Sequence, residues 1–271
     1  METRSGENVL LRYMTLAPCA LAFERYLECR MHGRVPHRRP VLDLGCGDGL
    51  FAQLALGAPV DTGVDPNMRD LARARERRVY RELIQCRADA VPKPDGAYRT
   101  ILANSVLEHI PALEPVLAEA YRLLAPGGRL YASVPSKRFS QYTAGHALLT
   151  GLGLRGMART WRRLYDAFWR HYHAYAEDEW ISRGRRYGFE LLECRPYAPR
   201  EVCLLNDLLV PLALPALVWR RLFDRWTLWP GLRRVALYPL YLLARRVLSR
   251  ADQAPLGGLV FLAFAKPGDA V

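Results

Sequence analysis

Short apolar runs and longer amphipathic stretches alternate along residues 40–135. Apolar runs of about four to eight residues are typical of buried strands, whereas apolar residues three and four positions apart are typical of helices. Their alternation predicts a parallel sheet with helices on both faces. Strands are expected at Pro40–Leu44, Val60–Val64, Leu83–Arg87, Tyr98–Asn104 and Arg129–Val134, and helices at Leu50–Leu56, Met68–Val79 and Leu113–Leu124.

The regular alternation is lost after Pro135. Residues 136–169 are interpreted as a basic, aromatic connection, and a long insertion is expected between the last two strands. Helices are expected at Leu16–Met31 and Glu177–Tyr187, and strands at Phe189–Arg195 and Leu259–Lys266.

Together these elements predict a Rossmann-like, doubly wound, seven-stranded α/β sheet with a helical insertion before the last strand. The predicted parts are an N-terminal helical segment at 1–39, the sheet domain at 40–195, the insertion at 196–256 and the closing strand at 257–271.

The most informative motif is a glycine-rich turn at Val41–Gly49, with the sequence VLDLGCGDG. Glycine is needed where such a turn is tight and a ligand lies against bare backbone. Asp65 ends the next strand, 16 residues after Gly49. A carboxylate there can accept both ribose hydroxyl protons of an adenosine, although it could instead cap the next helix. Leu50 stands where G-x-G-x-x-G has its third glycine, which argues against a nicotinamide dehydrogenase.

The stretch Val41–Pro135 resembles the class I S-adenosylmethionine (SAM)-dependent methyltransferases, in particular the bacterial group that acts on small molecules. The similarity rests on VLDLGCGDG, Gly63-Val64-Asp65, the segment NSVLEH at 104–109 and LLAPGGRL at 123–130. It implies SAM as the cofactor, with Asp89-Ala90 at the adenine. It also implies Asp43 near the ligand's ammonium group, directly or through water; Asp43 could instead cap the loop. The implied cofactor residues are Asp43, Gly45, Cys46, Gly47, Gly49, Asp65, Pro66, Asp89, Ala90, Asn104, Ser105 and His109.

Methyl transfer from SAM is an in-line displacement in which positioning and desolvation supply much of the catalysis. Transfer to a hydroxyl also benefits from a general base with a near-neutral pKa, which favours histidine. The segment HYHAYAEDEW begins at His171 and includes His173. In the resembling family a histidine at this place often faces the substrate, so both are candidate catalytic residues; an exposed aromatic loop is the alternative. No metal is expected, because no further ligands cluster near the pair in the sequence.

Charge and composition add a candidate partner. The chain has a net charge of +12, and 51% of its residues are hydrophobic. The stretch Gly151–Arg250 holds 18 arginines against nine acidic residues, together with all six tryptophans. A basic, aromatic segment suits a phosphate-rich surface, either an anionic membrane or a nucleic acid, and a solvated arginine-rich face is the alternative. The six cysteines form no C-x-x-C pair, which predicts reduced thiols and a cytoplasmic location.

The insertion contains two apolar runs, Glu201–Trp219 and Val235–Leu248. The first has nearly the length of a membrane span, but Asn206, Asp207 and two prolines within it argue against one. Apolar helices edged by Trp, Tyr and Arg suit the membrane interface. We therefore expect an interface-binding lid at the inner face of the membrane, with a plain cap or a dimer surface as alternatives.

The sequence predicts an enzyme that methylates an oxygen of an apolar small molecule or a lipid-linked acceptor. An RNA methyltransferase is less favoured, because Asn104 is followed by Ser105-Val106 and no N-P-P-Y motif is found. A non-catalytic SAM-binding scaffold is the other alternative. The oligomeric state stays open.

Overall fold

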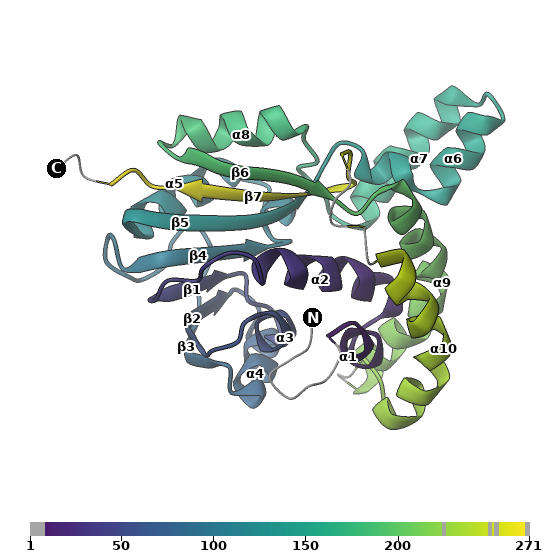
Figure 1. Ribbon diagram of the computed structural model, residues 1–271, viewed down its shortest axis with the longest axis horizontal. Coiled ribbons are helices and arrows are strands. Elements are labelled where there is room, and N and C mark those ends of the chain that lie inside the picture. The colour runs from purple at the N-terminus through teal and green to yellow at the C-terminus, as the bar shows by residue number, and fades with distance from the viewer. Residues whose placement is uncertain (1–8, 224–225, 249–250, 252–254, 269–271) are drawn as a thin grey trace.

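The computed structural model describes residues 9–223, 226–248, 251 and 255–268. Seven strands form one sheet in the order β3-β2-β1-β4-β5-β7-β6, which confirms the predicted fold (Figure 1). Strands β1 to β5 run parallel, and β7 runs antiparallel to both neighbours. The strands are β1 (Val41–Leu44), β2 (Val60–Asp65), β3 (Tyr80–Gln85), β4 (Tyr98–Asn104), β5 (Leu124–Pro135), β6 (Glu190–Tyr197) and β7 (Leu259–Ala265).

The order of the strands reverses at β1. From β1 the chain builds outward through β2 and β3, and then returns to place β4 on the other side of β1. Asp43 pairs with Gly63 of β2, and Leu42 pairs with Ile101 of β4. Ligands of doubly wound sheets bind at such a switch point, outside the carboxyl ends of the strands. The glycine-rich turn leaves β1 at this place.

Helices cover both faces of the sheet, because alternate residues of each strand point to opposite sides. In β5, Leu130 and Ala132 pack in one apolar cluster with Trp180, whereas Tyr131 packs in the other with Phe23. The sheet domain contains α3 (Leu50–Ala55), α4 (Met68–Arg77), α5 (Leu113–Leu123), α8 (Glu177–Arg186) and the short 3₁₀ helices η1 (Leu107–His109) and η2 (Phe139–Tyr142).

Two elements differ in their bounds from the prediction. Helix α4 ends at Arg77 and β3 begins at Tyr80, whereas a longer helix and a later strand were expected. Arg78 adopts a left-handed conformation with φ of 54°, which terminates the helix. Strand β5 begins at Leu124 and continues through the Pro-Gly-Gly segment, which was expected to precede the strand.

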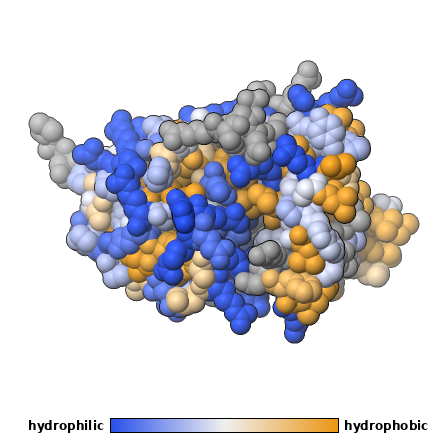
Figure 2. All heavy atoms as spheres, turned by 90° about the horizontal axis from the view of Figure 1, so that it is seen from below, coloured by the Kyte–Doolittle hydropathy of each residue, from blue (hydrophilic) through white to orange (hydrophobic). Residues whose placement is uncertain are grey.

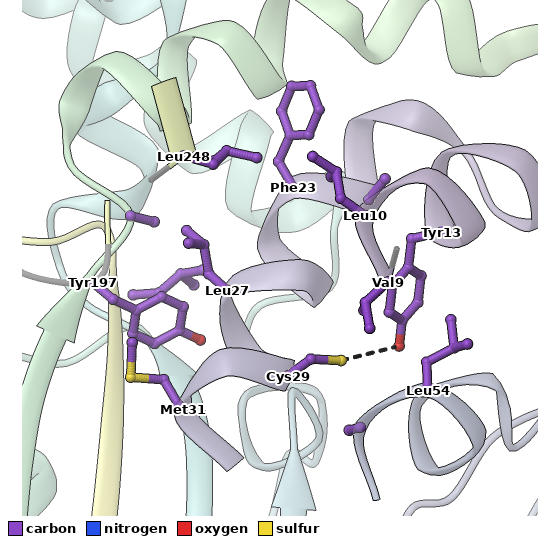
Figure 3. Close-up of a cluster of buried hydrophobic side chains, with 14 of the residues drawn as sticks. Val9, Leu10, Tyr13, Phe23, Leu27, Cys29, Met31, Leu54, Tyr197 and Leu248 are labelled. Atoms are coloured by element: carbon purple, nitrogen blue, oxygen red, sulfur yellow. Dashed lines mark hydrogen bonds between the residues drawn. The ribbon is translucent and has the colours of Figure 1, made fainter. Parts of the chain in front are cut away.

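The N-terminal segment forms two helices, α1 (Val9–Leu16) and α2 (Cys19–His32), where one was expected. Pro18 separates them in an extended conformation, and proline restricts the residue before it to extended backbone as well. Apolar side chains of both helices pack with residues of distant elements, including Tyr197 and Leu248 (Figure 3). The N-terminal helices therefore belong to the main apolar core.

The stretch after β5 forms a helical hairpin of α6 (Ala144–Gly151) and α7 (Arg155–Phe168), so the prediction of an irregular connection was wrong. The hairpin projects from one end of the sheet (Figure 1). Met157, Trp161, Leu164 and Phe168 recur at helical spacing but are exposed. Because the arginines between them masked this spacing, the sequence pattern resembled a loop.

The insertion forms two helices, α9 (Arg200–Phe223) and α10 (Pro230–Leu248). Helix α9 lies against α2, where the side-chain amide of Asn206 donates a hydrogen bond to the buried carboxyl of Glu24. Helix α10 lies against α1. No helix among the described residues is long and apolar enough to cross a membrane.

Candidate active site

The glycine-rich turn is held to the end of β2 by Asp65. The Asp65 carboxylate accepts hydrogen bonds from the backbone N–H groups of Gly47, at 3.0 Å, and Asn67, at 2.8 Å. Burial raises its pKa, and these two hydrogen bonds oppose that rise. The helix-capping role considered for Asp65 falls to Asn67, whose side chain accepts from the N–H of Arg69. The Asp65 carboxylate remains beside the turn.

The three glycines of the turn all have positive φ, but their surroundings differ. A Cβ at Gly45 would lie 2.6 Å from Val106, and one at Gly49 would lie 3.0 Å from Tyr80. A Cβ at Gly47 would meet nothing within 4 Å. Gly45 and Gly49 are therefore required by packing inside the protein, whereas Gly47 faces open space in a cavity.

A first cavity of about 410 Å³ opens at the carboxyl ends of β1, β2 and β4. One wall carries Asp65, and apolar side chains of Val106, Ile110 and Val116 form another. A carboxylate beside an apolar slot matches a ribose joined to an adenine. Among the predicted cofactor residues, Gly45, Asp65, Pro66, Asp89, Ser105 and His109 line it.

A second cavity of about 520 Å³ adjoins the first and shares Gly45, Ser105 and His109 with it. Cys46, Gly47 and Asn104 of the predicted set line this cavity. Much of the other lining comes from outside the sheet domain, and sequence reasoning did not assign these residues to the site. They include Tyr13, Ala17, Leu21 and Arg25 of the N-terminal segment and Arg220 and Trp226 of the insertion. Phe51 of α3, within the sheet domain, also lines this cavity.

Glu28 of α2 is the centre of a buried hydrogen-bond network that the sequence motifs did not reveal. Its wholly buried carboxylate accepts hydrogen bonds from Arg25, at 2.7 Å, Asn104, at 2.6 Å, and the Ser105 hydroxyl, at 2.9 Å. Ser105 is one of the few non-glycine residues with positive φ, at 52°. Such strain persists only where the surroundings over-determine the conformation. Glu28 supplies that restraint from a segment 77 residues away.

Three predicted cofactor residues lie outside the linings of both cavities. Asp43 is buried, and its carboxylate accepts a hydrogen bond from the Tyr80 hydroxyl at 2.6 Å. Burial raises the pKa of Asp43 to about 6. These contacts favour the alternative role, in which Asp43 supports the loop. Gly49 begins α3, and Ala90 is exposed next to Asp89, which pairs with Arg87.

The two candidate catalytic histidines have different surroundings. His173 is buried, with Nε2 2.9 Å from the Ile110 carbonyl and Nδ1 2.6 Å from the Tyr175 hydroxyl. Both ring nitrogens of His173 are therefore engaged in contacts within the protein, which argues against the catalytic role considered for it. The His171 side chain is 9% exposed, and its ring lies 5.2 Å from that of His109, which lines both cavities.

Glu108 completes a cluster with these two rings. One potential ligand atom from each of Glu108, His109 and His171 lies within 4.8 Å of the others. Burial raises the pKa of Glu108 to about 8 and lowers the pKa of His171 to about 4. The expectation that no further metal ligands gather near His171 is therefore wrong. The fold brings them together from two segments.

A family model described as "Methyltransferase domain" matches residues 20–194, which is more than half of the chain. The chain belongs to this family. It is a SAM-dependent methyltransferase, as the resemblance of its sequence implied. The cofactor is SAM.

Curated relatives match part of this methyltransferase. It is 31% identical over 110 residues to a ubiquinone biosynthesis O-methyltransferase of Vibrio atlanticus, covering 38% of the chain and 46% of the relative. It is 38% identical over 92 residues to a ubiquinone/menaquinone biosynthesis C-methyltransferase of Methylobacterium nodulans, covering 31% of the chain and 36% of the relative. The chain therefore spans less than half the length of these relatives.

Solved structures share the fold over nearly the whole chain. A SAM-dependent methyltransferase of Mesorhizobium loti superposes with a TM-score of 0.52 at 15% identity, covering 89% of this chain and 97% of the other. At this level of identity the similarity concerns the fold alone.

Proposed function

We propose that this methyltransferase transfers a methyl group from SAM to an oxygen of an apolar small molecule or a lipid-linked acceptor. The observation that carries the proposal is the second cavity, because it joins the cofactor turn to an apolar and aromatic wall. Ala17, Leu21, Phe51 and Trp226 form much of that wall. A relative named as a ubiquinone biosynthesis O-methyltransferase supports the same class of acceptor.

The residues of the two adjoining cavities fit SAM on three counts. SAM supplies a methyl group bound to a sulfonium sulfur. The acceptor attacks the methyl carbon in line with the carbon–sulfur bond and displaces the sulfur. The Asp65 carboxylate suits the ribose hydroxyls, and the apolar slot of Val106, Ile110 and Val116 suits the adenine. The open space at Gly47 lets the methionine part lie against bare backbone.

Arg25 is our candidate for holding the cofactor's carboxylate. Its guanidinium is tied to Glu28, and the side chain lines the second cavity beside Gly45 and Gly47. A guanidinium has five donors, so one bond to Glu28 leaves others for a carboxylate in the cavity.

We propose that His171 lies on the acceptor side and promotes loss of the acceptor's proton. The burial that lowers its pKa to about 4 keeps the ring neutral near pH 7, so a nitrogen lone pair is available. Its neighbour His109 provides the link to the cavity, since it lines both halves of the site.

We also propose peripheral contact with an anionic membrane, which would deliver an apolar acceptor to the second cavity. Trp226, in the connection between α9 and α10, lines that cavity, which supports a lid role for the insertion. Apolar residues on these helices remain exposed, including Leu222, Leu232 and Val235. Figure 2 shows apolar side chains gathered at one end of the molecule, beside a hydrophilic middle.

A screen with SAM labelled on its methyl group tests the proposed reaction. The purified full chain would be offered apolar phenols, quinols, lipid extracts and RNA, with a Gly47→Val variant as the matched control for cofactor-dependent transfer. We expect label in an organic-extractable methyl ether, with none from the control. Label found only in RNA would favour the RNA methyltransferase. SAM binding without transfer to any acceptor would favour the scaffold.

A further inference from the structure

Glu108, His109 and His171 meet at the wall of the active site, although His171 lies 62 to 63 positions after the other two. The segments that carry them are tied by backbone hydrogen bonds, because the N–H of Tyr172 donates to the Glu108 carbonyl at 2.8 Å. The N–H of His171 donates to the Asp166 carbonyl at 2.8 Å. One potential ligand atom from each of the three side chains lies within 4.8 Å of the others. This arrangement is therefore held by the backbone on both sides.

The His109 ring also has a neighbour that sets its orientation. His109 Nδ1 lies 3.2 Å from the Arg170 carbonyl, so this nitrogen carries the proton and donates. That leaves the Nε2 lone pair of His109, which lies 3.8 Å from the carboxylate of Glu108. His171 Nδ1 lies 4.0 Å from the carboxylate of Asp166, which is too far for a hydrogen bond, so it has no such partner. Metal-binding histidines are typically oriented by a carbonyl or a carboxylate on the other ring nitrogen.

The cluster contains buried polar atoms without hydrogen-bond partners among the described residues. They are Oε2 of Glu108 and Nδ1 of His171, in side chains that are 4% and 9% exposed. Leaving such atoms unpaired normally costs free energy. Arg25 and Glu28 near Glu108 offset each other in charge, because burial keeps the carboxyl of Glu24 neutral near pH 7. A bound cation would satisfy the unpaired atoms.

We propose that Glu108, His109 and His171 bind one divalent transition-metal ion at the acceptor side of the cofactor cavities. Two imidazoles and a carboxylate suit zinc, iron or cobalt and leave positions open for an acceptor oxygen. A tetrahedral ion with bonds of about 2.1 Å holds its ligand atoms about 3.4 Å apart. The ligand atoms of the three side chains, which lie within 4.8 Å of one another, would reach this spacing by small side-chain rotations.

The role of the ion rests on the proposed O-methyl transfer. A hydroxyl bound to a divalent ion is far more acidic than a free one. The acceptor's O–H bond then breaks, its proton passes to solvent, and the oxygen electron pair forms the bond to the methyl carbon. The carbon–sulfur bond breaks in the same step, and its electron pair leaves the sulfur as a neutral thioether. In this scheme His171 promotes loss of the acceptor's proton by binding the ion that makes the hydroxyl more acidic.

Titration of the metal-stripped full chain with Co²⁺ tests the site without any acceptor. Calorimetry gives the stoichiometry and affinity, and visible absorption distinguishes nitrogen and oxygen ligands from cysteine thiolate. We expect one equivalent to bind with a Kd in the micromolar range or below. Glu108→Gln and His171→Ala should each raise the Kd at least tenfold, and His146→Ala on α6 serves as the control that leaves it unchanged.

SAM binding and the melting temperature of each variant are measured on the same samples. A variant that still binds SAM and melts normally but loses Co²⁺ supports the site. Absence of saturable Co²⁺ binding to a chain that binds SAM overturns it, as does equal binding by all variants. Because no acceptor is used, failure of the metal site leaves the proposed methyl transfer standing. Failure of the acceptor screen likewise leaves the metal site standing.

Discussion

At the scale of single residues, the site depends on backbone that few side chains tolerate and on carboxylates held away from water. Gly47 leaves open space where the cofactor must approach, and Asp65 fixes the turn from the next strand. Ser105 keeps a left-handed conformation because Glu28 holds its hydroxyl. The chemistry at this scale is therefore positioned by contacts between residues that are distant in the sequence.

We predict that Asp65→Ala weakens SAM binding by about 1–3 kcal/mol, the usual cost of leaving buried polar groups without a partner. Gly47→Val should weaken it more, because a branched side chain fills the open space and strains a residue with φ of 53°. Calorimetry with SAM measures both.

Gly127→Val is the matched control for Gly47→Val. Gly127 also has positive φ, at 71°, and open space around it, but it lies in β5 away from the cavities. It should reduce stability through the same strain while leaving SAM affinity unchanged. Normal SAM binding by the Asp65→Ala and Gly47→Val variants would mean that the cofactor site is misplaced.

His171→Ala should lower turnover about a hundredfold or more while leaving SAM affinity nearly unchanged, since a group that assists proton loss typically supplies that much. His173→Gln serves for comparison, because both nitrogens of His173 are engaged in structural contacts. It should act on stability rather than on kcat. Steady-state kinetics with the acceptor found by the screen measures both variants. Unchanged turnover of His171→Ala would remove it from the site.

At the scale of elements, segments outside the sheet build one wall of the second cavity. Helices α1 and α2 pack against α10 and α9. Helices α1 and α2, the turn between them and the connection between α9 and α10 supply much of the apolar lining. The contact between α2 and α9 includes a buried hydrogen bond between Glu24 and Asn206. The stability of this contact should therefore depend on the protonation of Glu24.

Burial raises the pKa of Glu24 from 4.5 to about 8. Between these values the folded chain holds a proton that the unfolded chain releases, so the free energy of unfolding falls as pH rises. We predict that Glu24→Gln reduces this fall between pH 5 and 8 by up to about 1.4 kcal/mol per pH unit. Urea unfolding at several pH values measures it. Parallel pH profiles for the two proteins would contradict the buried neutral carboxyl.

The exposed apolar residues of α9 and α10 lead to a prediction about membrane binding. We expect the chain to pellet with anionic vesicles at low salt, and to do so less at high salt without complete release. Headgroup attraction is screened by salt, whereas apolar insertion is not. Leu232→Ser with Val235→Ser on α10 should reduce pelleting, since both side chains are at least 70% exposed.

Leu192→Ser is the control for this experiment, because Leu192 is half exposed on β6, away from the insertion. Leu164→Ser on α7 tests whether the α6–α7 hairpin takes part in the same contact. A chain that stays in the supernatant with anionic vesicles at low salt would leave the insertion as a plain cap or a dimer surface.

At the scale of the whole molecule, the sheet domain was predictable from local pattern. Each strand carries its own apolar run, and parallel strands covered on both faces need little other information. The sequence was enough to predict that the turn after β1 lies next to the carboxylate at the end of β2, because this fold places the ends of consecutive strands side by side. The seven-stranded, doubly wound sheet agreed with the prediction, whereas the order of its strands was not predicted.

What the sequence by itself determined is therefore the α/β fold and the glycine-rich turn with Asp65 after the next strand, because each depends on one short stretch of residues. Tertiary structure alone decided the rest. The restraint of Ser105 by Glu28, the lining by Arg25 and Trp226, and the Glu108–His109–His171 cluster join residues from separate segments. A side chain's partners depend on packing across the fold, which local periodicity does not contain.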